Sequence, residues 1–313
     1  MPLEPQSKAL MDELLASGVT PRYLMTPEEG RKYALRTFVE LAGPPEPIYK
    51  TEDRTITTHS GNVKIRIYTP SNKPKMPALV YFHGGGWRFG SIETHEAPCR
   101  TLANLADCKV ISVEYSLSPE YPFPVAMEQS YNATKWVYDN AASLGIDPDR
   151  IAVGGDSSGG NLAASACVAA RDRGNLPPIF YQVLIYPVVD FYYPGTNSYK
   201  EHGTGYFLTA EAMKIYWDSY LGRTEDSQNA YAAPLTAADF EDMPPGLIVL
   251  AQYDPLYDEG VKYAEKLKVE GIPAKVLTYE GVMHGFWGMA AKIDLARKAH
   301  ADVAAELRKA FAQ

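Results

Sequence analysis

A serine lies at the centre of the glycine-rich segment Gly154–Gly160, which directly follows the apolar run Ile151–Val153 and precedes an alanine-rich segment of high helix propensity. A G-x-S-x-G sequence between a strand and a helix is typical of a nucleophile elbow, a sharp turn that exposes the serine hydroxyl. Gly155 and Gly159 remove side chains that would collide in so tight a turn. We therefore expect Ser157 to be a nucleophile in acyl transfer, the simpler alternative being a serine that caps a helix.

Three successive glycines in the sequence His-Gly-Gly-Gly-Trp at 83–87 follow another predicted strand. Their entropic cost makes sense if backbone N–H groups must approach a ligand closely. Acyl transfer needs such donors at the position of the tetrahedral oxyanion, and we expect the N–H groups of Gly85, Gly86 and Ser158 to supply them. His83 is expected to orient this loop rather than to act as a base. The chain contains neither a dinucleotide-binding fingerprint nor a P-loop, which argues against a phosphate-binding role for the glycines.

A serine nucleophile needs a histidine base, and in enzymes with this elbow the histidine follows both the serine and the acid along the chain. This order excludes His59, His83 and His95. Of the later histidines, His284 follows the last predicted strand and is flanked by glycines, which places it on a loop at the carboxyl edge of the sheet. His202 lies in an aromatic-rich insert, and His300 is expected on the surface of the C-terminal helix. We therefore expect His284 to be the base.

The acid that orients the base is expected to be Asp254, which follows the predicted strand 247–251. The alternative role of Asp254 is to cap the helix that begins near Leu256. Asp258 and Asp190 are the rival acids, Asp258 because it lies in the same segment and Asp190 because it follows the strand 183–185.

Short apolar runs alternate with helical segments along most of the chain. The predicted strands are 78–82, 110–113, 151–153, 183–185, 247–251 and 275–279. The predicted helices are 92–106, 124–143, 158–173, 257–270 and 290–311. This alternation indicates an α/β fold with a parallel sheet and right-handed crossovers, flanked by helices. A hairpin predicted at 55–59 and 63–68 makes the sheet mixed.

The connection between Tyr186 and Leu247 is far longer than a single crossover requires, and it is rich in aromatic residues. It contains a predicted helix that begins after Thr209 and ends at Gly222. Two further helices are predicted at the N-terminus, the second starting with the capping box Thr26–Glu29. We expect 1–45 and 188–230 to form a cap over a pocket, and 46–187 with 231–313 to form the catalytic domain. An extra packing layer is the alternative.

Several large side chains in these segments are placed to line an apolar acyl or alcohol pocket, or else to pack in the core. They are Trp87, Tyr186, Phe207, Leu208 and Phe286. Asp156, next to the nucleophile, is assigned to the same substrate-binding set.

Composition narrows the function classes. The chain has 313 residues, 46% hydrophobic and 22% charged, and a net charge of −8, which argues against a nucleic-acid partner. No apolar run is long enough for stable membrane insertion, and no histidine or cysteine spacing indicates a metal or another cofactor. The N-terminus lacks the pattern of a signal peptide. Cys99, Cys108 and Cys167 form no CxxC pair, so buried free thiols and a cytoplasmic location are expected.

Five ordered blocks resemble the hormone-sensitive-lipase-like carboxylesterases of the α/β-hydrolase superfamily: HGGGW at 83–87, EYSLSPEYPFPVA at 114–126, GDSSGG at 155–160, DPLYDEG at 254–260 and HGF at 284–286. The resemblance implies an α/β-hydrolase fold with a helical cap and hydrolysis of short- to medium-chain carboxylic esters. The family usually has alanine where Ser158 stands, and Arg and Ala where Ser116 and Ser118 stand. Non-catalytic receptors related to the family lack the histidine, whereas His284 is present.

The sequence therefore predicts a serine carboxylesterase that works through an acyl-enzyme intermediate on a small-molecule ester. An amidase or peptidase with the same triad, a lipase acting at an oil interface and a non-catalytic ligand-binding relative are the alternatives. The natural ester, the acyl chain-length limit, the enantioselectivity and the oligomeric state stay open, a homodimer through the edge of the last strand being one arrangement.

Overall fold

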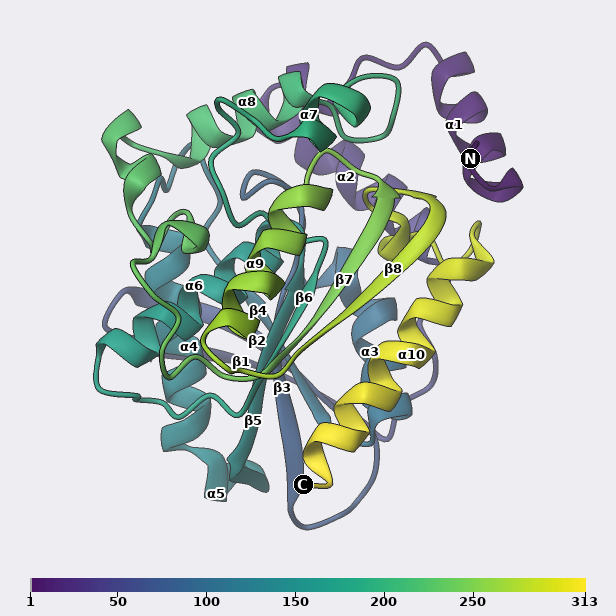
Figure 1. Ribbon diagram of the computed structural model, residues 1–313. Coiled ribbons are helices and arrows are strands. Elements are labelled where there is room, and N and C mark those ends of the chain that lie inside the picture. Colours follow the sequence, from purple (N-terminus) through teal and green to yellow (C-terminus); the bar gives the residue numbers. More distant parts are fainter. Residues whose placement is uncertain (1) are drawn as a thin grey trace.

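A computed structural model describes residues 2–313 of the chain. Within these residues the centre is an eight-stranded sheet in the order β1-β2-β4-β3-β5-β6-β7-β8 (Figure 1). Strand β2 pairs antiparallel with β1 and β4, and the other neighbours are parallel, which confirms the predicted mixed sheet. The strands are β1 (Lys50–Thr58), β2 (Gly61–Thr69), β3 (Met76–Phe82), β4 (Lys109–Glu114), β5 (Ile146–Asp156), β6 (Tyr181–Ile185), β7 (Gly246–Tyr253) and β8 (Ala274–Met283).

Helices cover both faces of the sheet, as expected for strands that are apolar on both sides. Helices α3 and α10 lie on one face and α4, α6 and α9 on the other (Figure 1). In β3, Val80 and Phe82 belong to one core and Leu79 and Tyr81 to the opposite one, the alternation expected of a strand. The helices are α1 (Pro5–Ala16), α2 (Pro27–Ala42), α3 (Glu96–Ala106), α4 (Val125–Asp139), α5 (Ala141–Leu144), α6 (Ser158–Asp172), α7 (Asn197–His202), α8 (Ala210–Tyr220), α9 (Tyr257–Val269) and α10 (Asp294–Phe311).

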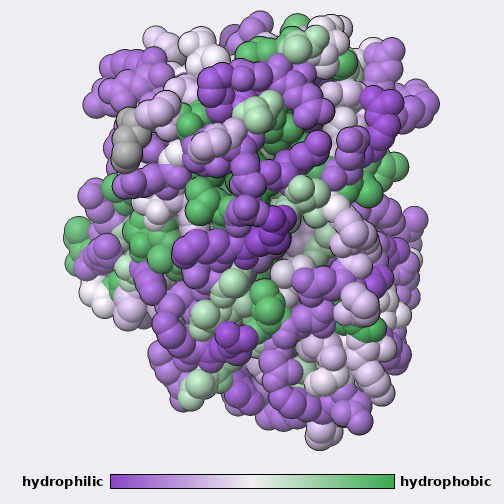
Figure 2. Space-filling model, turned by 90° about the vertical axis from the view of Figure 1, so that its right-hand side faces the viewer, coloured by the Kyte–Doolittle hydropathy of each residue, from purple (hydrophilic) through white to green (hydrophobic). Residues whose placement is uncertain are grey.

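Helices α1, α2, α7 and α8 lie together beyond one end of the sheet (Figure 1). The capping box at Thr26 starts α2 as predicted, and the Thr209 hydroxyl accepts from the N–H of Ala212 at the start of α8. Apolar side chains are also exposed in the N-terminal part of this region, among them Leu15, Val19, Leu24, Leu35 and Val39. On the face in Figure 2, apolar side chains form small groups between hydrophilic ones. Met1, the first residue of the predicted range 1–45, lies outside the described residues.

His300 is buried rather than on the surface, so that prediction was wrong. Its ring packs edge-on against that of Trp287, with 4.1 Å between the ring centroids, and its Nε2 donates to the Trp287 carbonyl at 2.9 Å. The sequence did contain the signal, because Ala296, His300, Val303 and Leu307 recur at helical spacing on the buried side of α10. Burial lowers the pKa of His300 to about 4.

This burial predicts a loss of stability in mild acid. Above the unfolded pKa of about 6.5 the ring is neutral in both states, but as the pH falls towards 4 only the unfolded chain takes up the proton. His300→Gln keeps a donor for the Trp287 carbonyl, so it should reduce the fall in unfolding free energy between pH 7 and pH 5 by about 2 kcal/mol. Urea unfolding at the two pH values measures this, with the exposed His59→Gln as control. An equal fall in wild type and His300→Gln would contradict the prediction.

Candidate active site

Ser157 lies in the turn between β5 and α6, and its backbone has a positive φ of 56° with ψ −120°. The turn lies against the carboxyl end of β3. A Cβ added at Gly155 or Gly159 would lie 2.3 Å or 1.9 Å from the carbonyl oxygen of Phe82. Only glycine fits at these two positions, because any side chain would collide with the backbone of β3. The elbow holds the serine in a strained conformation, as is common for residues at functional sites.

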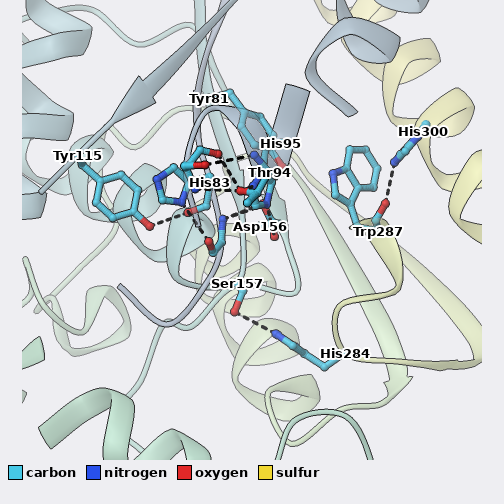
Figure 3. A network of polar contacts seen from close by, with 12 residues as sticks. Tyr81, His83, Thr94, His95, Tyr115, Asp156, Ser157, His284, Trp287 and His300 are labelled. Carbon is cyan, nitrogen blue, oxygen red and sulfur yellow. Dashed lines mark hydrogen bonds and ion pairs between the residues drawn. The ribbon is translucent and has the colours of Figure 1, made fainter. Parts of the chain in front are cut away.

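The structure brings Ser157, His284 and Asp254 together at the carboxyl ends of β5, β8 and β7. His284 Nε2 is 2.9 Å from Ser157 Oγ, and His284 Nδ1 is 2.6 Å from Asp254 Oδ2; Figure 3 shows the contact between serine and histidine. Because an ionised carboxylate only accepts, Nδ1 carries the proton and Nε2 is left to accept from the serine hydroxyl. All three side chains are buried or nearly so.

Asp254 performs both roles considered for it. Its Oδ1 accepts from the N–H of Leu256 at 2.8 Å at the start of α9, while Oδ2 faces His284. The rival acids hold other parts of the chain. Asp190 Oδ1 accepts from the N–H of Phe191, and Asp258 Oδ2 accepts from the N–H of Ser198.

The loop after β3 lies beside the serine and exposes backbone donors. Gly85 and Gly86 have φ of 130° and 63°, and a Cβ at either would lie within 2.6 Å of Phe89 O or the Tyr216 ring. Throughout residues 2–313, nothing accepts a hydrogen bond from the N–H groups of Gly85, Gly86 or Ser158. These are the three donors that the sequence assigned to the oxyanion.

Asp156 fixes this loop. It accepts from the Tyr81 hydroxyl at 2.8 Å and from the Gly84 N–H at 3.1 Å, and its carboxylate lies 3.2 Å from His95 Nε2 (Figure 3). Burial alone would raise the pKa of Asp156, but His95 and the Tyr81 hydroxyl lower it overall. With its oxygens occupied in this way, Asp156 positions the loop although it borders the cavity.

His83 supports the same loop, as predicted. Its Nδ1 lies 3.0 Å from the Gly84 carbonyl, its ring stacks on Tyr115 at 4.2 Å, and the Tyr115 hydroxyl donates to the His83 carbonyl at 2.7 Å. Burial lowers the pKa of His83 to about 3, so the ring is neutral. The contributions of Tyr81, His95 and Tyr115 were missed, because nothing in their sequence spacing distinguishes them from core residues.

A cavity of about 380 Å³ opens above Ser157 and His284. Tyr186, Phe207 and Leu208 line it, together with residues of α1, α2, α8 and the connection between α1 and α2. Trp87 and Phe286 are fully buried in the core and do not border the cavity, which corrects their assignment to the pocket. Trp87 stacks on Tyr220 and donates from Nε1 to Asn161, because the preceding glycine turn directs its side chain under α8.

The three cysteines are free and buried, and burial raises the pKa of each thiol. Within residues 2–313, no three His, Cys, Asp or Glu side chains are grouped so that they could hold a metal ion. The same residues include no helix with both the length and the apolar character needed to cross a membrane.

A mixed sheet flanked by helices, with a serine elbow after β5, defines the α/β-hydrolase class, and residues 79–288 match the family described by its alpha/beta hydrolase fold. An arylesterase of Saccharolobus solfataricus is 36% identical over 92% of this chain and 93% of its own. The structure of a hyperthermophilic esterase from Pyrobaculum calidifontis is 41% identical, with a TM-score of 0.94 and 99% of both chains covered. That of a thermostable carboxylesterase cloned from a metagenomic library is 43% identical, with a TM-score of 0.88 and 92% and 98% of the two chains covered.

The chain thus belongs to the α/β-hydrolase family and, within it, to the hormone-sensitive-lipase-like carboxylesterases that its sequence blocks resemble.

Proposed function

We propose that the protein hydrolyses carboxylic esters of short to medium chain length through an acyl-enzyme on Ser157. The observation that carries this proposal is the hydrogen-bonded series Ser157 Oγ, His284 Nε2, His284 Nδ1 and Asp254 Oδ2, next to three N–H groups that have no acceptor within residues 2–313. A nucleophile, an oriented base and an oxyanion site in one cavity are the parts that acyl transfer requires.

In acylation, His284 accepts the proton of Ser157 as the hydroxyl oxygen attacks the ester carbonyl. The negative charge that develops on the carbonyl oxygen is bound by the N–H groups of Gly85, Gly86 and Ser158, and Asp254 stabilises the imidazolium. The C–O bond to the alcohol then breaks, and His284 gives its proton to the departing oxygen. In deacylation, His284 removes a proton from a water molecule as the water oxygen attacks the acyl carbon, and the same donors bind the second oxyanion. The bond between Ser157 Oγ and the acyl carbon then breaks, the acid leaves, and His284 returns its proton to Oγ.

The cap is proposed to comprise 1–45 and 188–230, with the catalytic domain formed by 46–187 and 231–313. Tyr186, Phe207 and Leu208 border the cavity and would contact the substrate. The cavity volume of about 380 Å³ suits a small or medium ester. An ester that fills the cavity would exclude water from the surroundings of Ser157. The three free thiols fit a reducing compartment, and we propose the cytoplasm.

A series of p-nitrophenyl esters of increasing acyl length, compared with the p-nitroanilides of the same acids, tests the function. We expect kcat/KM to be highest for short and medium acyl chains and the esters to exceed the matched anilides. Equal or faster anilide hydrolysis would identify an amidase. A rise in activity at an emulsion interface would identify a lipase, and failure of an organophosphonate to label Ser157 would favour a non-catalytic binding protein.

A further inference from the structure

The side chain of Arg22, in the connection between α1 and α2, lines the cavity that contains Ser157 and His284. Its guanidinium carbon lies 4.6 Å, 5.3 Å and 5.7 Å from the ring centroids of Phe38, Phe89 and Phe207. Aromatic faces attract a cation and hold the planar group in a fixed place.

Among residues 2–313 this guanidinium has no acidic partner. Arg31 pairs with Glu120, Arg66 with Asp53 and Arg173 with Glu128. In contrast, the Nε of Arg22 is buried without a hydrogen-bond acceptor, and no carboxylate within residues 2–313 forms an ion pair with it. A partly buried cation without a counter-ion is unfavourable, and the three rings offset only part of that cost.

The cavity therefore holds a positive charge that no carboxylate within residues 2–313 pairs with. Asp156 also borders it, but that carboxylate already accepts from Tyr81 and Gly84 and faces His95. The positive charge of Arg22 is left inside a pocket that is otherwise mostly apolar, in a chain whose net charge is −8.

Two of the rings that hold Arg22 also lie next to residues that surround the reacting groups. Phe207 contacts the position of Gly285, next to His284, and the Phe38 ring lies 6.3 Å from that of His95, which faces Asp156 beside Ser157. An anionic group against Arg22 and an ester carbonyl at Ser157 would therefore occupy the same cavity.

We propose that Arg22 binds a carboxylate of the substrate, so that the enzyme favours esters which carry a free carboxylate on the acyl or the alcohol part. This inference rests on the proposed ester hydrolysis and specifies its substrate class. The planar guanidinium would donate two parallel N–H bonds to the carboxylate in the low-dielectric pocket.

Two matched pairs of esters test it. In the acyl pair, the p-nitrophenyl monoester of adipic acid is compared with a neutral ester in which an isopropyl group replaces the carboxylate. In the alcohol pair, p-carboxyphenyl acetate is compared with p-isopropylphenyl acetate. The ratio of kcat/KM for the anionic ester to that for its neutral partner is measured in wild type, Arg22→Gln, Arg22→Lys and Arg36→Gln. Arg36 is the matched control, because it also lies over an aromatic ring, that of Tyr33, but is exposed and outside the cavity.

In at least one pair, Arg22→Gln should lower the ratio about 10- to 100-fold, mainly through KM, because a charge-assisted bidentate contact is lost. Arg22→Lys should keep part of the ratio, and Arg36→Gln should leave it unchanged. If both ratios are the same in Arg22→Gln as in wild type, Arg22 serves only to pack the cap and the proposal is wrong. If the wild-type enzyme hydrolyses neither neutral ester, it is the proposed ester hydrolysis that has failed.

Discussion

Ser157→Ala is expected to lower kcat for a p-nitrophenyl ester by about a millionfold, while the far-ultraviolet circular dichroism stays that of wild type. The loss is this large because the variant has no atom that can form the acyl-enzyme, so the remaining groups act only on water. The fold should be unaffected, since the Ser157 side chain contacts His284 but the elbow is held by its backbone. The N–H of Ser157 donates to the Ile185 carbonyl at 2.8 Å, and its carbonyl accepts from the N–H of Asn161 at 3.0 Å.

Ser165→Ala is the matched control for this experiment. Ser165 lies on α6, and its buried hydroxyl has no hydrogen-bond partner among the described residues. Its removal deletes the same kind of atom, a buried serine Oγ, two turns along the helix that follows the elbow, and Ser165 does not line the cavity. Activity of Ser157→Ala close to that of Ser165→Ala would refute the assignment of the nucleophile.

Asp254→Asn should lower kcat by about ten-thousandfold through the proton on the histidine. The side-chain amide must keep its oxygen towards the N–H of Leu256, where Oδ1 now accepts at 2.8 Å. Its NH₂ group then faces Nδ1 of His284 in place of Oδ2. An NH₂ group donates, so the ring would carry its proton on Nε2 and could no longer accept from Ser157. In Asp254→Asn, the hydrogen bond at the start of α9 thus fixes the amide in the orientation that favours the unproductive tautomer of His284.

Asp258→Asn changes the same atoms four residues further along. Asp258 accepts from the N–H of Ser198, a bond that an asparagine oxygen can replace. We expect its kcat to stay close to that of wild type. A comparable loss in both variants would mean that the segment as a whole, rather than the carboxylate facing His284, is needed.

The elbow and its partners were predictable because their chemistry restricts both residue type and chain order. A serine between glycines, a glycine triplet after a strand and a histidine after the last strand are local patterns, and the chain order excluded the earlier histidines. The class of fold was predictable for a similar reason: short apolar strands alternate with longer helical segments along the chain, and this alternation is typical of an α/β fold.

The roles that could not be predicted depend on where a side chain points in the folded protein, which the order of residue types does not show. Trp87 and Phe207 are both aromatic residues in loops near the serine, yet only Phe207 borders the cavity. The difference arises from backbone turns that sequence does not reveal. The roles of His95 and Arg22 depend on what faces them from distant segments, Asp156 in one case and three phenylalanine rings in the other.

The stacking of Trp87 on Tyr220 connects the loop after β3, which supplies Gly85 and Gly86, to helix α8. The rings lie 4.2 Å apart and 3° from parallel, and Gly86 lies against Tyr216 of the same helix. Lifting α8 to admit a larger substrate would pull at the loop whose N–H groups receive the developing charge. The size of the ester that the cavity accepts and the rate of turnover are thus coupled through α8. Variants of α8 selected for bulky esters should therefore have a lower kcat, although no residue of α8 takes part in the reaction.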